Sequence, residues 1–268
     1  MWQHDAGRSA ASEAPLPDRP VLLWTLPLPA LDPCWEDIVN RDRMPFDAQY
    51  EPVVSGTTLV VVSNRDDSVA AYDTRSGRDL WRVVTDGPVR LPPVLHDGRV
   101  HAVSDDGWLY TWGLADGAPL WRVRDGRDER RVLGNGRLVS AWCARGGPVV
   151  LDGTLYFGAG IWPFMGTYVQ AVDARTGAPV WTQGVLGSLY IKQPHPGAES
   201  FGAVTPQGAL AAAGDRLVVP NGRALPAVLR RGDGSLVHFR LDGSIVHDVG
   251  EATDRKLEGG SYVCTDGR

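Results

Sequence analysis

Residues 71–81 (AYDTRSGRDLW) decide the fold, because the stretch returns at 171–181 (AVDARTGAPVW) and, more loosely, at 111–121 (TWGLADGAPLW). A unit repeated every few tens of residues indicates one supersecondary element copied along the chain. A fourth, more diverged copy at 228–238 keeps its glycine, Gly234, but has Arg230 in the aspartate position and His238 in the tryptophan position. The sequence therefore predicts a repeat architecture, and functional residues are expected where the copies differ.

Each copy also contains a glycine-centred turn before an apolar run, at Gly56, Gly98, Gly153 and Gly214. The unit is interpreted as a short strand, a tight turn, an apolar strand, a connection, an alternating strand, a glycine turn and a strand that carries tryptophan. In the first unit these strands are expected at about 50–55, 58–63, 68–73 and 79–84. The pattern predicts an all-β protein built from four-stranded sheets.

Composition excludes several classes of protein. With 43% hydrophobic residues and no apolar run near the length of a membrane-spanning helix, the chain is expected to bury a core and not to span a membrane. The net charge of -5 and the lack of a basic cluster make nucleic acid an unexpected partner. Cys34, Cys143 and Cys264 are too far apart for a CxxC motif and are expected to be buried small apolar side chains.

The pattern A-x-D-x-x-[TS]-G-x-x-x-W, preceded by D-G-x-[LV], resembles the pyrroloquinoline-quinone (PQQ) type repeat of β-propellers, from about residue 19 to the C-terminus. That repeat occurs in quinoprotein dehydrogenases and in the outer-membrane assembly factor that shares their fold without their chemistry. The chain is similar to a broad group of bacterial PQQ-like propeller proteins. The resemblance implies four-stranded blades at about 49–91, 92–146, 147–205 and 206–260, after an irregular segment at 1–19 and before a further blade that starts at 261–268.

The repeated residues have structural roles in this interpretation. Sheets arranged radially need large flat side chains between them, and a buried indole contributes on the order of 4 kcal/mol as an upper value. The glycines close the turn before the outermost strand with backbone angles that a Cβ would strain. The structural residues are Asp73, Gly77, Trp81, Gly117, Trp121, Asp173, Gly177 and Trp181.

Both ends of the chain resemble parts of a unit. Residues 20–26 (PVLLWTL) resemble an outermost strand with Trp24, without the three strands that should precede it. Residues 261–268 reproduce the opening of a unit and then stop. We therefore expect a fragment of a larger propeller, a partial ring of about four blades plus terminal strands.

The two faces of such a ring are expected to differ. The turns between strands one and two and between strands three and four are short, whereas the other connections are long and share the opposite face. Elaborated loops on a rigid scaffold mark the working surface, so this face is expected to bind a planar or polyhydroxylated ligand or, alternatively, to plug the central channel. The candidate binding residues are Arg65, Arg90, Trp142, Arg145, Trp162, Phe164, Lys192, His195, Gln207, Asn221 and Arg223.

No catalytic residue or metal site is predicted. His195 lies in an elaborated loop, but no spacing places an acid or a nucleophile beside it. The pairs Asp66 with Asp67 and Asp105 with Asp106 invite a calcium site, yet they lie in short connections where aspartate commonly caps a turn. We expect turns at both pairs.

Two functions are weighed. The first is a non-catalytic binding or scaffold module in the periplasm or otherwise outside the cytoplasm, a location implied by the resemblance, since the residues after Met1 are polar and unlike a signal peptide. Its partner would be a protein or a small-molecule or carbohydrate ligand. The alternative is a PQQ-dependent alcohol or sugar dehydrogenase, for which the resemblance implies an adjacent cysteine pair and a calcium held by Glu, Asn and Asp. No adjacent cysteines occur, so PQQ with calcium is expected only under the alternative.

Overall fold

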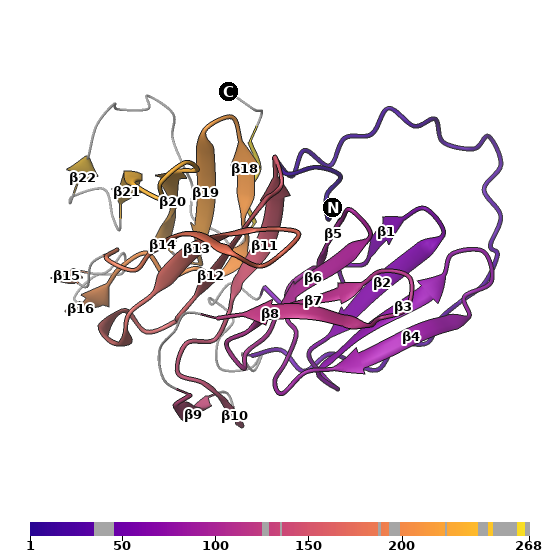
Figure 1. Cartoon of the computed structure of the whole chain (residues 1–268), viewed down its shortest axis with the longest axis horizontal. Coiled ribbons are helices and arrows are strands. Elements are labelled where there is room, and N and C mark those ends of the chain that lie inside the picture. Colours follow the sequence, from indigo (N-terminus) through magenta and orange to yellow (C-terminus); the bar gives the residue numbers. More distant parts are fainter. Residues whose placement is uncertain are drawn as a thin grey trace.

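The computed structural model describes residues 1–34, 46–124, 129–134, 136–186, 189–192, 199–222, 224–240, 246–248 and 262–265. Four β-sheets of four or five strands, mostly antiparallel, follow one another along the chain and stand side by side in Figure 1. The only helical element among these residues is one 3-10 turn, η1 (Pro163–Met165), so no helix found there could cross a membrane. The predicted fold class, a partial propeller of successive β-sheets, is confirmed.

The first two sheets are simple meanders in which each strand pairs with the next along the chain. Their strands are β1 (Val53–Ser55), β2 (Thr58–Ser63), β3 (Ser68–Asp73), β4 (Asp79–Val84), β5 (Val94–His96), β6 (Arg99–Val103), β7 (Leu109–Gly113) and β8 (Pro119–Val123). The four strands predicted for the first unit are all present. Only the innermost is shorter than expected, since it begins at Val53.

The third and fourth sheets each have a fifth strand, which the prediction of four strands per unit did not include. In the third sheet, the chain on its way to the fourth runs parallel to the inner strand, so Gly208 pairs with Gly146. Two hairpins lie outside the four sheets. The remaining strands are β9 (Arg131–Gly134), β10 (Arg137–Ser140), β11 (Gly146–Leu151), β12 (Thr154–Ala159), β13 (Tyr168–Asp173), β14 (Pro179–Gln183), β15 (Leu189–Lys192), β16 (Glu199–Gly202), β17 (Gly208–Ala209), β18 (Ala211–Ala213), β19 (Arg216–Asn221), β20 (Ala224–Arg230), β21 (Leu236–Arg240) and β22 (Val246–Asp248).

The core fills the spaces between successive sheets. Val62 of the first sheet packs in one cluster with Ala102 of the second, and Val103 of the second packs in another with Phe157 of the third. These residues alternate along their strands, so each sheet presents one apolar face to each neighbour. The third and fourth sheets share a further cluster.

The repeated tryptophans lie at the contacts between sheets. The indole Nε1 of Trp81 donates to the carbonyl oxygen of Leu114 in the next sheet at 2.9 Å. A Cβ placed on Gly117, whose φ is +70°, would lie 2.8 Å from the Trp81 ring. Trp121 and Trp181 make the same two contacts with the third and fourth sheets. Glycine is therefore required at this turn both by its φ and by the ring that covers it.

Residues 20–26 contact the first sheet as an outermost strand would. Trp24 donates to the Thr74 carbonyl oxygen at 2.9 Å and lies against Gly77, as the other indoles do against their glycines. The segment pairs with no described strand. It is thus extended, with the tryptophan contact of an outermost strand and without its hydrogen-bonded ladder.

The two faces of the arc differ as the sequence predicts. On one face the short turns bond to each other, since Leu114 N–H donates to the Gly98 carbonyl and Ala174 N–H to that of Gly153. On the other face the β9–β10 hairpin contacts the longer connections, through Ser140 N–H to the Asp105 carbonyl. We call this second face the loop face, formed by residues 64–67, 104–108, 129–134, 136–145 and 160–167.

Candidate functional site

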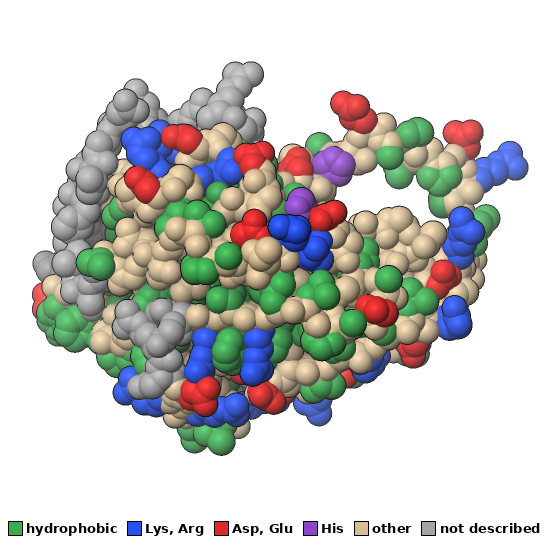
Figure 2. Space-filling view, viewed as in Figure 1, with side chains coloured by type: hydrophobic (Ala, Val, Ile, Leu, Met, Phe, Trp, Pro, Cys, Tyr) green, Lys and Arg blue, Asp and Glu red, His purple; other side chains and the backbone are tan. Residues whose placement is uncertain are grey.

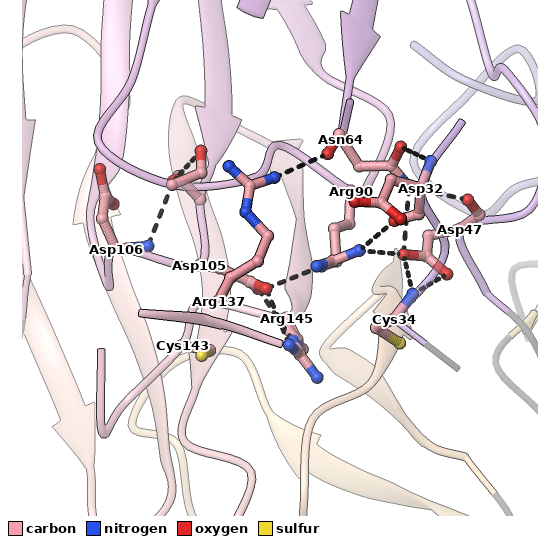
Figure 3. A network of polar contacts seen from close by, with 12 residues as sticks. Asp32, Cys34, Asp47, Asn64, Arg90, Asp105, Asp106, Arg137, Cys143 and Arg145 are labelled. Atoms are coloured by element: carbon pink, nitrogen blue, oxygen red, sulfur yellow. Dashed lines mark hydrogen bonds and ion pairs between the residues drawn. The ribbon is translucent and has the colours of Figure 1, made fainter. Parts of the chain in front are cut away.

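A buried network of ionic side chains lies at the loop face where the first three sheets meet (Figure 3). Arg145, just before β11, donates to both carboxylate oxygens of Asp105, from Nε at 2.8 Å and from Nη2 at 2.7 Å. Arg90 lies between two carboxylates, with Nε 2.7 Å from Asp105 Oδ2 and Nη1 2.5 Å from Asp47 Oδ2. Two arginines thus share two aspartates.

The four side chains are 0 to 3% exposed, and their formal charges cancel. Burial alone would raise the pKa of Asp105, but the two guanidinium groups outweigh it and hold that pKa below its usual range. The same carboxylate raises the pKa of Arg145, against the effect of its burial. The hydrogen bonds between these arginines and aspartates join charged partners, which makes them short and directional.

The network also fixes irregular chain segments. Asn64 donates to the Asp47 carbonyl at 3.0 Å and accepts from Asp32 N–H at 2.8 Å. Asp47 in turn accepts from Cys34 N–H at 3.0 Å. Through these bonds the segment before the first sheet is tied to the loops of the first two sheets.

Cys34 and Cys143 are buried beside this network, as expected, whereas Cys264 is exposed. Burial raises the pKa of the Cys34 thiol to about 12, and it raises that of Cys143 still further. Both thiols therefore stay protonated at neutral pH and are poor nucleophiles.

The predicted aspartate turns are correct for one member of each pair. Asp106 accepts from the N–H groups of Trp108 and Asp86, and Asp66 accepts from the Ser68 hydroxyl at 2.9 Å. Asp105 instead pairs with arginines, and Asp67 pairs with Arg137 at 2.5 Å. Sequence reasoning missed these ion pairs because their arginines lie 15 to 70 residues away.

The structure brings together only part of the predicted binding set. Arg90 and Arg145 share Asp105, and both guanidinium groups are buried in ion pairs. Trp142 is buried, 8% exposed, and donates from Nε1 to the Met165 carbonyl at 3.0 Å. Trp162 is half-buried against Gly134 of the β9–β10 hairpin.

The other candidates that the structure describes make none of the network bonds given above. Arg65 and Phe164 are exposed. Asn221 is buried, accepts from Thr205 N–H and donates to the Leu225 carbonyl, and the Gln207 side chain lies beside Gly222. His195, Arg223 and the side chain of Lys192 lie outside the described residues.

An exposed apolar patch on the loop face was not predicted. Leu133 and Leu138 are direct cross-strand partners in the β9–β10 hairpin, and they are 77% and 63% exposed. Phe164, 64% exposed, follows Trp162, which packs on the same hairpin. In Figure 2 hydrophobic and arginine side chains gather over the lower projection that Figure 1 identifies as β9–β10. The sequence signal is the Asn-Gly turn in VLGNGRLV, which is typical of a hairpin.

The described residues do not fit a calcium ion that would hold PQQ. Calcium takes six to eight oxygen ligands, including several carboxylates. Asp47 and Asp105 already pair with arginines, and in the described ranges no three His, Cys, Asp or Glu side chains come together as metal ligands. This donor set provides no place for the ion.

Comparison with known proteins agrees with this architecture. The family model described as outer membrane protein assembly factor BamB matches residues 2–160. Among solved structures, BamB from Moraxella catarrhalis is 17% identical, with a TM-score of 0.41, over 72% of this chain and 60% of that chain. The quinohemoprotein alcohol dehydrogenase ADHIIG from Pseudomonas putida HK5 is 17% identical, with a TM-score of 0.50, over 70% of this chain and 33% of its own.

A quinohemoprotein alcohol dehydrogenase from Comamonas testosteroni is 16% identical, with a TM-score of 0.44, over 78% of this chain and 45% of that chain. No curated protein sequence matches the chain. The chain thus spans less than two thirds of each of these solved structures, and the likeness to ADHIIG shows a shared fold.

Proposed function

The chain belongs to the family of the outer membrane protein assembly factor BamB, and from this membership we propose that it is a non-catalytic binding or scaffold module that works outside the cytoplasm. Its partner is a protein that docks on the loop face. The proposal rests mainly on the exposed pair of Leu133 and Leu138.

This pair contributes little to the stability of the chain itself, because its two side chains are mostly exposed. Leucines exposed together on a projecting hairpin are typical of an interface centre, where they bury apolar area against a partner. Phe164 is a further exposed apolar side chain of the loop face, and the exposed Arg131 within the hairpin provides a charged edge. A partner with an apolar groove and acidic edges matches this surface.

The buried charges favour a scaffold over an enzyme. Arg90, Arg145 and Asp105 are positioned by each other and hold the first three sheets together, so this network leaves no carboxylate poised as a general base. The alternative, a PQQ-dependent alcohol or sugar dehydrogenase, is tested directly by adding PQQ and calcium and following dye reduction with alcohols and sugars. A substrate-dependent reduction would replace the scaffold proposal.

The docking surface is tested by photo-crosslinking in the native host. A photoreactive amino acid at Leu138 is expected to give one discrete protein adduct, and the same group at Leu120, 51% exposed on β8, is the matched control. A Leu133→Asp variant, checked for an unchanged melting temperature, is expected to lose the adduct. Fractionation of the same cells reports the compartment. Adducts at Leu120 but not at Leu138, or recovery in the cytosol, would contradict the proposal.

A further inference from the structure

A pocket of about 330 Å³ lies between the extended segment 26–29 and the face of the first sheet formed by β2, β3 and β4. Cavities of about 300 to 1,000 Å³ are typical of small-molecule sites. The polar side chains that line it are Ser63, Asp66, Ser68, Asp79 and Arg82, with the rings of Tyr50 and Tyr72. Asp66 lies in the loop face, but none of these residues belongs to the β9–β10 hairpin on which the docking proposal rests, so the two proposals can fail separately.

One small side chain on the wall of the pocket distinguishes the first sheet from the next two. Ala70 on β3 pairs with Arg82 on β4, and the matching pair in the second sheet is Tyr110 with Arg122. In the third sheet the same position is Gln170, paired with Thr182. At this position the first sheet thus has a methyl group, the second sheet has an aromatic ring and the third sheet has a long amide.

Without an aromatic ring at position 70, the nearby carboxylate of Asp66 is more exposed than its counterpart in the second sheet, Asp106. In the second sheet the Tyr110 hydroxyl donates to Asp106 Oδ2 at 2.6 Å, and Asp106 is 8% exposed. In the first sheet the side chain of Asp66 is 45% exposed, and it accepts from the Ser68 hydroxyl at 2.9 Å and from Arg82 at 3.4 Å. Burial opposes ionisation, but hydrogen bonds from Ser63 and Ser68 and the charge of Arg82 lower the pKa of Asp66, so it is an anion at neutral pH.

The guanidinium of Arg82 is held in place by hydrogen bonds and is still accessible to solvent. Arg82 donates from Nη2 to the Tyr72 hydroxyl at 2.9 Å and from Nη1 to the Ser68 hydroxyl at 3.1 Å, while its side chain is 45% exposed. By contrast, Arg122 lies over the Trp108 ring, 4.4 Å from its centre. The first sheet therefore presents a donor and an acceptor side by side toward the pocket.

The opposite wall is also fixed. The Tyr50 hydroxyl donates to the Pro29 carbonyl at 2.7 Å, and Leu26 and Leu28 pack against the first sheet. Pro27 and Pro29 restrict the backbone of this wall, so little order has to be gained on binding. The pocket is thus preformed.

We propose that this pocket binds a neutral polyhydroxylated ligand, a single sugar or a short oligosaccharide. Adjacent ring hydroxyls both donate and accept, which matches a carboxylate beside a guanidinium, and an aromatic ring packs against the apolar face of a sugar. Asp66 and Arg82 cancel in charge, and Asp79 at the pocket adds a negative charge, which disfavours an anionic ligand.

The test titrates the purified full chain with glucose, N-acetylglucosamine, cellobiose and chitobiose, followed by calorimetry and saturation-transfer NMR. Wild type is expected to bind at least one of them saturably. Ala70→Tyr, which restores the ring of the second sheet, is expected to abolish that binding. Asp66→Asn keeps the size of the side chain and is expected to weaken binding about tenfold through loss of a charged hydrogen bond.

Arg122→Gln, at the register position that matches Arg82, is the control and leaves the affinity unchanged. Melting temperatures show whether each variant is folded. If Ala70→Tyr is unfolded, the affinity of Asp66→Asn decides the test. No saturable binding by any of the four sugars, or equal binding by wild type and the pocket variants, overturns the proposal. Self-association that the pocket variants abolish, without a response to sugar, would identify a protein segment as the occupant and also overturn it.

Discussion

Gly117→Ala tests whether the indole contact between sheets stabilises the arc. Gly117 has a φ of +70°, and its added Cβ would lie 2.8 Å from the Trp81 ring. Gly98 in the same sheet is the matched control, since its φ is +68° and nothing lies within 4 Å of a Cβ there. Both variants pay the left-handed backbone strain, and only Gly117→Ala also meets the ring.

The expected magnitudes follow from these two effects. Alanine in the left-handed region costs about 1 to 2 kcal/mol, which is the whole expected effect of Gly98→Ala. Overpacking against the indole adds about 1 to 3 kcal/mol, so Gly117→Ala is expected to lower the free energy of unfolding by about 2 to 5 kcal/mol. The loss is larger if the ring moves and its bond to the Leu114 carbonyl breaks.

The assay is urea unfolding followed by circular dichroism, for both single variants and in a Trp81→Ala background. In the Trp81→Ala background, Gly117→Ala is expected to lower the free energy of unfolding only by the left-handed backbone strain. The double-mutant cycle then gives a coupling of about 1 to 3 kcal/mol between Gly117 and Trp81. Equal costs for Gly98→Ala and Gly117→Ala, or an excess that persists after the ring is removed, would refute the role given to Trp81.

Three further outcomes are expected. Asp105→Asn leaves the buried guanidinium groups of Arg90 and Arg145 with one carboxylate fewer, and urea titration should show a loss of about 3 to 5 kcal/mol. Burial lowers the pKa of His101 to about 3, below its ordinary 6.5, so stability falls as pH drops below about 6.5, by about 2 kcal/mol near pH 5. His101→Gln should remove that slope when unfolding is measured against pH. Burial raises the pKa of Glu51 from 4.5 to about 7. The stability that Glu51 contributes is therefore complete below pH 4.5 and is lost as pH rises through about 7. Glu51→Gln should flatten the plot of unfolding free energy against pH in that range.

The repeated architecture is predictable because its signals are local. The apolar run of β2 and the glycine turn at Gly77 each lie within a few residues, and they define strands without knowledge of the partner sheet. The extra strand β17 has no such signal, since Gly208 and Ala209 become a strand only where β11 offers a free edge.

The candidate site is less predictable because its contacts are distant in the chain. Arg145 and Asp105 are 40 residues apart, and nothing in the sequence selects this pair from the other arginines and aspartates. Trp142 looks like a recognition residue in an elaborated loop, yet it is 8% exposed because the loop folds back onto Met165. The exposed leucines of VLGNGRLV show the converse, since a hairpin can be expected from the turn but its exposure cannot.

The hydrogen bonds from the indole N–H groups all run in one direction along the chain. Trp24, Trp81, Trp121 and Trp181 each donate to a carbonyl that is translated 50, 33, 54 and 50 residues later. At about 5 to 20 residues per second, a ribosome takes about 2 to 11 seconds to supply each acceptor. Every sheet therefore keeps an open flank until the segment that carries its acceptor has also emerged, from the ribosome or on the far side of a membrane, and chaperones have access to that flank during the interval.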